Sequence, residues 1–171
     1  MKKLVGIIGS GQQTLNSDEE LKFAYELGQA LGRAGYKIVC GGLGGIMEAV
    51  SKGVKSVAGQ ASVDVVCIIP QDRAEYANPF CDIVIPTGMG IMRNFLVVRS
   101  SQVLIAISGG SGTLSEIAAA WQMGKKVLCV TGFGGWAARL AGEDLDQRHS
   151  GLLVPVQTVD QILDFLETDL G

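Results

Sequence analysis

Three glycine-rich segments of this chain are suited to holding a phosphate group, and two of them end in a carboxylate. They are Gly9-Ser10-Gly11, Gly41-Gly42-Leu43-Gly44-Gly45-Ile46-Met47-Glu48 and Gly109-Gly110-Ser111-Gly112-Thr113-Leu114-Ser115-Glu116. Each follows an apolar run that predicts a strand, and the second and third open predicted helices. Glycine lets the backbone approach a ligand closely, and the first N–H groups of a helix lack intrahelical partners. The sequence therefore predicts a phosphate site built from these segments.

Glu116 has two compatible interpretations. With Thr113 it forms the pattern of a capping box, in which a carboxylate of the first helical turn accepts from the N-cap backbone. The alternative is a carboxylate beside the phosphate, placed to accept from a sugar hydroxyl or to polarise a glycosidic bond. Both interpretations stay open at this point.

Arg93 is the cation whose position is most informative. It lies near the start of a predicted helix, where a positive charge opposes the helix dipole. Such a position indicates a nearby anion, either a phosphate or Glu116, although a surface arginine is the simpler alternative. Arg99 is six residues further on, so it points to a different face or to a subunit contact. The turn-like segment Tyr76-Ala77-Asn78-Pro79 is a further candidate for the pocket lining.

The composition limits the classes of protein to which this chain can belong. The chain has 171 residues, 47% of them hydrophobic and 18% charged, which predicts one globular domain. The net charge of −3 gives no general attraction to nucleic acid or to anionic lipid. The apolar runs are too short for a membrane span, and the first of them is too short for a signal peptide. We therefore expect a cytoplasmic protein with neither nucleic acid nor membrane as a partner.

The four cysteines do not suggest a metal site. No two of them form a Cys-x-x-Cys pair, and the chain has a single histidine, His149. Three are expected as buried thiols in strands and the fourth as an exposed thiol in a loop, so folding should need neither a protein-bound metal nor oxidation. The three strand cysteines are Cys40, Cys67 and Cys129, and the loop cysteine is Cys81.

Strand-like and helix-like segments alternate along the chain, which predicts a doubly wound, Rossmann-like α/β fold with helices on both faces of a parallel sheet. The expected strands are Leu4–Ile8, Lys37–Cys40, Val65–Ile69, Ile83–Ile85, Val103–Ile107 and Val127–Val130. The expected helices are Asp18–Ala34, Gly45–Ala58, Gly90–Ser100, Thr113–Met123 and Val159–Thr168, with a loop and short helix over Gly132–Gly142. Open parallel sheets bind ligands at the carboxyl ends of their strands, where all three glycine-rich segments fall.

These motifs resemble the LOG (Lonely Guy) superfamily over roughly residues 4 to 130. The segment from Gly109 to Glu116 matches the family's PGGxGTxxE motif, with Ser108 in place of the proline, and Gly41 to Met47 matches its GGxxGxM element. Family enzymes hydrolyse the N-glycosidic bond of nucleoside monophosphates. The resemblance implies that Arg93 and Glu116 correspond to the catalytic pair, and that Arg99 corresponds to a second phosphate-binding arginine.

Two departures bring the chain closer to the molybdenum cofactor carrier proteins, which share the fold and bind a pterin monophosphate. The motif proline is lost, and the histidine and lysine that flank the enzymes' arginine are absent from Met92-Arg93-Asn94. This resemblance implies that the molybdenum cofactor (molybdopterin) is bound and not cleaved, without a metal ligated by the protein. The alternative ligand is a nucleoside monophosphate, hydrolysed as in the LOG enzymes. A third alternative is a phosphate-binding regulator without turnover.

The resemblance further implies a homodimer or a tetramer, and molybdoenzymes as recipients of the cofactor. Arg93 and Glu116 would be catalytic only in a hydrolase. The implied ligand-binding residues are Gly9, Ser10, Gly11, Gly41, Gly42, Gly44, Met92, Arg93, Asn94, Arg99, Gly109, Gly110, Ser111, Gly112, Thr113 and Glu116.

Overall fold

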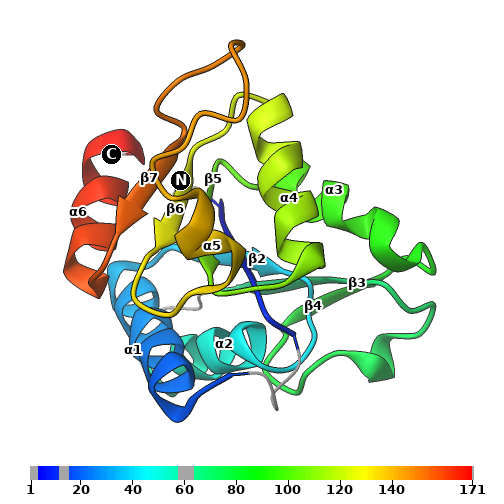
Figure 1. Ribbon diagram of the computed structural model, residues 1–171. Helices are drawn as coiled ribbons and strands as arrows, with labels where there is room; N and C mark the ends of the chain where they lie inside the picture. The colour runs from blue at the N-terminus through cyan, green and yellow to red at the C-terminus, as the bar shows by residue number, and fades with distance from the viewer. Residues whose placement is uncertain (1–3, 12–15, 58–63, 171) are drawn as a thin grey trace.

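The computed structural model describes residues 4–11, 16–57 and 64–170. Within these residues, seven strands form one parallel sheet in the order β4-β3-β2-β1-β5-β6-β7 (Figure 1). The strands are β1 Leu4–Gly9, β2 Lys37–Cys40, β3 Val65–Ile69, β4 Ile83–Pro86, β5 Val103–Ile107, β6 Val127–Val130 and β7 Leu153–Val156. The helices are α1 Asp18–Ala34, α2 Ile46–Ser56, α3 Asn94–Ser100, α4 Ser111–Gln122, α5 Gly135–Leu140 and α6 Val159–Leu170, with short 3₁₀ segments η2 Ala74–Tyr76 and η3 Gly90–Arg93. The predicted Rossmann-like fold is confirmed.

Helices cover both faces of the sheet. Helices α1, α2 and α6 lie on one face, and α3, α4 and α5 lie on the other (Figure 1). The side chains of β5 alternate between the two cores, since Ile105 packs in one cluster and Leu104 in the other. All five residues of β5 have no exposed surface, as expected for a strand buried on both faces.

The local sequence explains where α1 begins and ends. Ser17 is the N-cap, and its hydroxyl accepts from the backbone of Glu20 at 3.2 Å, while the Glu20 carboxylate accepts from the backbone of Ser17 at 2.6 Å. This is a complete capping box. Gly35 ends the helix in the left-handed conformation, with φ 74°, which glycine adopts at little cost.

Three elements differ from the sequence prediction. Strand β7 was not predicted, because Pro155 interrupts its apolar pattern; the structure places it at the sheet edge, where proline is tolerated. The helix expected over Gly90–Ser100 is split into η3 and α3. Helix α4 begins at Ser111, two residues before the predicted start, and this shift changes the role of Glu116.

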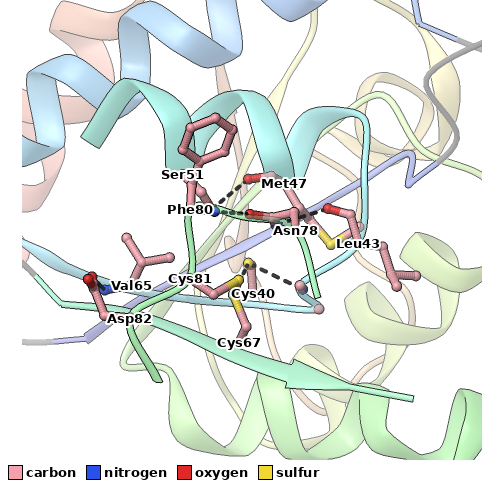
Figure 2. Close-up of a disulfide and its surroundings, with 12 residues drawn as sticks. Cys40, Leu43, Met47, Ser51, Val65, Cys67, Asn78, Phe80, Cys81 and Asp82 are labelled. Carbon is pink, nitrogen blue, oxygen red and sulfur yellow. Dashed lines mark hydrogen bonds between the residues drawn. A yellow bond between two sulfur atoms is a disulfide. The ribbon is translucent and has the colours of Figure 1, made fainter. Parts of the chain in front are cut away.

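Two of the cysteine predictions are wrong. Cys67 and Cys81 form a disulfide, whereas Cys40 and Cys129 are free and buried as expected (Figure 2). The segment between β3 and β4 turns back so that the two bonded cysteines have Cα atoms 5.9 Å apart, a normal separation for a disulfide. This pairing depends on the path of the segment, which the spacing of cysteines in the sequence does not reveal.

The strand order places a topological switch point between β1 and β5. Strands β2, β3 and β4 extend the sheet to one side of β1, and β6 and β7 extend it beyond β5. The segments that follow β1 and β5 therefore diverge from each other at the carboxyl edge of the sheet, which leaves a crevice between them. Among the described residues, no helix is long and apolar enough to cross a membrane.

Candidate ligand-binding site

A cavity of about 270 Å³ opens at this switch point. Its walls come from the segments that follow five strands, namely β1, β2, β3, β4 and β5, from the first turn of α2 and from the first two turns of α4. The lining residues are Gly9, Gly11, Leu43, Met47, Pro70, Gly90, Ile91, Arg93, Asn94, Gly112, Thr113 and Glu116. Apolar side chains and glycine backbone thus surround a small group of polar side chains, an arrangement typical of small-molecule sites.

A second cavity of about 260 Å³ adjoins the first between two of the predicted glycine-rich segments. It is lined by Gly9, Ser10, Gly11, Gly110, Ser111, Gly112 and Thr113, and it shares four of these residues with the first cavity. The N-cap of α4 is Gly110, and no side chain caps this helix end. The unpaired N–H groups of the first turn and the helix dipole therefore favour an anion here.

The geometry of Gly110 leaves room for such an anion. A Cβ built on Gly110 would have no heavy atom within 4 Å. At Gly109, by contrast, φ is 92° and a Cβ would lie 2.3 Å from the Thr113 hydroxyl oxygen. Gly109 is therefore required for the turn itself, whereas Gly110 faces open space.

The Arg93 side chain is buried beside the first cavity, with only 5% of the residue exposed. Nη1 donates to Asn94 Oδ1 at 2.6 Å, and Nη2 donates to the carbonyl of Gly41 at 3.1 Å. Nη1 also lies 3.6 Å from Glu116 Oε1. Of the two anions that the sequence left open for Arg93, the structure places Glu116 beside it, and the alternative of a surface arginine is wrong.

One donor of this guanidinium remains without a partner. Arg93 Nε is buried and makes no hydrogen bond to any of the described residues. A buried, unsatisfied donor is costly, and a charged one more so. Burial lowers the pKa of Arg93 and Glu116 raises it again, but a guanidinium keeps its charge in proteins.

Glu116 is not the capping residue that the sequence pattern suggested. Because α4 begins at Ser111, Glu116 lies in the second turn, and no capping hydrogen bond is present at Gly110. Burial raises the pKa of Glu116 to about 8, and nearby Arg93 only partly counteracts this. Burial therefore favours the protonated form of this carboxyl group, which can donate a hydrogen bond into the cavity.

Asn94 connects Arg93 to the glycine-rich start of α4. Its amide nitrogen donates to the Ser115 hydroxyl at 3.0 Å and to the Gly112 carbonyl at 3.4 Å. Ser115 in turn donates to the same carbonyl at 2.6 Å. These bonds hold the cationic side of the site and the start of α4 in one arrangement.

The second glycine-rich segment lies behind the guanidinium. A Cβ on Gly41 would lie 2.4 Å from Arg93 Nη2, so only glycine lets the arginine approach this backbone. Gly42, with φ 68°, packs against Cys67, and a Cβ there would lie 2.9 Å from the Cβ of that cysteine. This segment supports the site and contributes Leu43 and Met47 to its wall.

The structure does not bring every predicted site residue to the cavities. Met92 and Arg99 are exposed and line neither cavity, and Gly41, Gly42, Gly44 and Gly109 lie behind or beside the lining. The turn Tyr76–Pro79 is not part of the lining either; instead, Asn78 holds the backbone of Leu43. The lining residues that sequence reasoning missed are Leu43, Met47, Pro70, Gly90 and Ile91. Their position just after predicted strands was the available signal for most of them.

The described part of the chain contains no group of three His, Cys, Asp or Glu side chains placed to hold a metal ion. The free cysteines belong to the apolar cores, where burial raises the pKa of Cys40 and raises that of Cys129 to about 12. The polar groups of the cavities are instead suited to an anion and to hydrogen-bonding heteroatoms.

Comparison with known proteins gives a family match over most of the chain. The SLOG cluster4 family matches residues 2–163. An uncharacterized protein of Archaeoglobus fulgidus is 43% identical over 123 residues, which is 72% of this chain and 76% of that protein.

Solved structures with the same fold include proteins named for the molybdenum cofactor. The protein TM1055 superposes with a TM-score of 0.87 at 32% identity, covering 97% of this chain and 99% of its own. A molybdenum cofactor binding protein of Rippkaea orientalis gives a TM-score of 0.82 at 28% identity, covering 100% and 99%. The molybdenum cofactor carrier protein of Chlamydomonas reinhardtii gives 0.81 at 26% identity, covering 98% of each chain.

Proposed function

Because the chain belongs to the SLOG cluster4 family, we propose that it is a single-domain protein that binds the molybdenum cofactor, a pterin with a monophosphate, and carries it without turnover. The observation that carries this proposal is the buried guanidinium of Arg93, whose Nε has no partner among the described residues and which borders the cavity. Solved relatives named for binding or carrying this cofactor support it. The pair of adjoining cavities suits a ligand with a phosphate at one end and a polar ring system at the other.

The phosphate is proposed to bind between the first and third glycine-rich segments. Backbone N–H groups at the start of α4 and the open space over Gly110 favour a tetrahedral anion there. Ser10 and Ser111 line the same cavity and add hydroxyl groups. This part of the site recognises the phosphate and not the group attached to it.

The ring system is proposed to lie in the first cavity. The guanidinium of Arg93 lines this cavity, and a protonated Glu116 can donate to a carbonyl or ring nitrogen. Leu43, Met47 and Ile91 supply apolar contact with the faces of the ring. When bound, the cofactor brings its molybdenum on its own dithiolene sulfurs, so this chain needs only to bind and shield it.

A nucleoside monophosphate hydrolase is the second candidate, and the pKa of Glu116 favours it. A buried carboxyl group with a pKa of about 8 is suited to donate a proton to a leaving base at neutral pH. In that reaction Arg93 would stabilise developing charge beside it. The same residues thus suit cleavage of an N-glycosidic bond, and experiment must separate the two functions.

Two measurements on one preparation make this separation. The chain is incubated with released molybdenum cofactor and passed through a gel-filtration column, after which retained pterin is quantified by fluorescence. A parallel sample is incubated with AMP and assayed for adenine and ribose 5-phosphate. We expect stoichiometric retention of pterin and no base release above the rate without protein. Base release without pterin retention would contradict the carrier function and favour the hydrolase.

We also propose that the protein is a homo-oligomer whose copies meet at an apolar surface near the site. Seven large apolar side chains of residues 83–96 are each between 38% and 63% exposed. They are Ile83, Ile85, Met89, Ile91, Met92, Phe95 and Leu96. At about 200 Å² for each large side chain, the exposed apolar area is roughly 700 Å², larger than the usual patch of a monomer.

The arrangement of this surface favours a second copy of the chain as its occupant. Val84 packs against the core on the α1 and α2 face, so its neighbours Ile83 and Ile85 point to the α3 side of the sheet. Helix α3 packs over β1 and β2, so the edge strand β4 keeps an exposed face. Parallel sheets are normally covered on both faces. Helix α3 likewise has apolar side chains on its outer side. A two-fold axis would place the α3 of each copy on the exposed strand of the other, burying about the 800 Å² per partner of a standard interface.

The remaining partners follow from the carrier function. A protein that binds this cofactor without cleaving it must release it to another protein, so molybdoenzymes are the proposed recipients. We place this exchange in the cytoplasm, in agreement with the expectation from composition.

A further inference from the structure

Three sulfur atoms lie directly behind the ligand site. The disulfide joins Cys67 of β3 to Cys81, and the free thiol of Cys40 lies 3.8 Å from the sulfur of Cys67 (Figure 2). Cys40 is the last residue of β2, so it immediately precedes the second glycine-rich segment. Its sulfur also accepts from the backbone of Gly42 at 3.4 Å. The cluster is therefore connected to the backbone that supports Arg93.

The segment closed by the disulfide, residues 67–81, holds one wall of the site. Asn78 of this bridged segment donates through its backbone to the carbonyl of Gly42 at 2.8 Å and through its side chain to the carbonyl of Leu43 at 3.1 Å (Figure 2). Asn78 is itself held close to the disulfide, since its carbonyl accepts from Cys81 at 3.4 Å. The position of Leu43 in the cavity wall thus depends on a residue three positions from a bonded cysteine.

The bridged segment contacts the site at a second place. The carbonyl of Pro70, a lining residue, accepts from the backbone of Gly90 at 3.1 Å, and Gln71 accepts from Gly88 at 2.9 Å. The disulfide therefore fastens the segment that positions both the wall after β2 and the wall after β4.

The two bonded sulfurs differ in access. Cys67 has no exposed surface, whereas Cys81 is only partly buried. Cys81 is therefore the more accessible of the two to an external thiolate, and attack there leaves the departing Cys67 sulfur inside the protein. Burial raises the pKa of the Cys40 thiol, which stays protonated and does not compete for Cys67.

We propose that the Cys67–Cys81 disulfide is a reversible redox switch that sets the affinity of the adjoining ligand site. A dithiol reductant attacks Cys81, so that a mixed disulfide forms and Cys67 leaves as a thiolate and takes up a proton. The second thiol of the reductant then closes its own disulfide and releases Cys81. The two electrons come from the dithiol, and the chain gains two thiols. A disulfide in a cytoplasmic protein is commonly of this transient, redox-sensing kind.

The inference rests on the proposed ligand site, and its test therefore includes a readout without ligand. Amide hydrogen exchange is followed by mass spectrometry in the oxidised chain, after reduction with dithiothreitol, and after reoxidation. We expect at least tenfold faster exchange in residues 41–45 and 76–81 after reduction, no change in β6, and recovery after reoxidation. Equal exchange in both states, or a Cys81 that is already a free thiol in the purified chain, would overturn the proposal.

Two variants and one binding measurement complete the test. Cys81→Ala should exchange like the reduced chain and ignore dithiothreitol, whereas Cys129→Ala, which changes a free cysteine of the opposite core, should respond like the wild type. If Cys81→Ala fails to fold, the change in amide exchange of the wild type on reduction and its recovery on reoxidation still test the proposal. Retention of molybdenum cofactor should fall at least threefold on reduction. Unchanged cofactor retention together with altered amide exchange would contradict the redox switch and leave the carrier function intact. An absence of cofactor retention in both redox states would contradict the carrier function alone.

Discussion

At the scale of single residues, the main feature of this protein is a buried arginine beside a buried carboxyl group whose pKa is raised. The terminal nitrogens of Arg93 donate to two acceptors, and Nη1 lies 3.6 Å from Glu116 Oε1, whereas Nε has no hydrogen-bond partner among the described residues. Such a group is expensive to bury unless a ligand completes its hydrogen bonds. Arg93 and Glu116 are therefore the residues whose substitution best separates binding from catalysis.

For a carrier, we predict that Arg93→Ala weakens retention of the molybdenum cofactor tenfold or more, because a charge-assisted hydrogen bond contributes about 1.5–3 kcal/mol. Glu116→Gln should change it less than threefold, since an amide has nearly the shape and donor capacity of a protonated carboxyl group. Retained pterin measured by equilibrium dialysis checks both effects. Arg33→Ala, which removes an exposed arginine from the end of α1, is the matched control. A loss of AMP cleavage in Glu116→Gln, with binding intact, would instead support a hydrolase.

The raised pKa of Glu116 also predicts a pH dependence of stability. Between its ordinary value of 4.5 and about 8, the folded chain keeps a proton that the unfolded chain releases. This contribution to the free energy of unfolding is therefore fully present below pH 4.5. It is lost as the pH rises toward about 8, by at most about 1.4 kcal/mol per pH unit. Urea unfolding at pH 5, 6, 7 and 8 should show the wild type losing stability relative to Glu116→Gln. A constant difference across this range would show that Glu116 is already ionised in the folded chain.

At the scale of elements, the site is built by the segments that leave parallel strands at one edge. The chain diverges between β1 and β5, and the first turn of α4 then presents unpaired N–H groups to the crevice. Glycine is needed where the backbone turns or where another group approaches, as at Gly109 and Gly41. At Gly110 neither reason applies. We therefore infer that glycine is needed there because it leaves the space beside the backbone open.

We therefore predict that Gly110→Val abolishes cofactor retention while the chain still folds. The added side chain would enter the open space at the start of α4, where no heavy atom lies within 4 Å of the new Cβ. Gly132→Val is the matched control, because that glycine also has open space and no positive φ but lines neither site cavity. Thermal unfolding followed by circular dichroism should give similar curves for both variants. Normal cofactor retention by a folded Gly110→Val chain would show that the phosphate does not bind beside Gly110.

At the scale of the whole molecule, the covering of the sheet is incomplete. Helices on both faces bury the central strands, but β4 and the outer side of α3 keep large apolar side chains in solvent. Ile91 belongs both to this surface and to the cavity wall. Assembly of two copies there would therefore also shield the ligand site from solvent.

We predict that Phe95→Glu raises the dissociation constant of the dimer about a hundredfold, because burying an unpaired charge costs about 3 kcal/mol or more. Sedimentation velocity over a range of concentrations measures the change. Leu145→Glu, at an exposed leucine outside residues 83–96, is the control and should leave the assembly unaltered. A wild type that sediments as a monomer at every concentration would rule out this interface.

The sequence alone was sufficient for the architecture and for placing the glycine-rich segments at one edge of the sheet, because both depend on local patterns. Continuous runs of Val and Ile predict strands buried on both faces, and glycines after those strands predict a site at the carboxyl edge of the sheet. Those patterns placed Arg93 near an anion and identified Gly9 to Gly11 and Gly110 to Thr113, which the structure brings to one cavity. The edge strand β7 was missed because Pro155 obscures its pattern.

Tertiary structure decided what depends on distance through space. The same Thr113-x-x-Glu116 spacing suits a capping box or a buried ion pair, and only the start of α4 at Ser111 excludes the first. The pairing of Cys67 with Cys81 depends on how the chain returns from β3 to β4. The raised pKa of Glu116 arises from burial, which is a property of the packed core. Spacing along a chain specifies hydrogen bonds within one or two turns, whereas desolvation and contacts between distant segments exist only once the layers of the fold have packed.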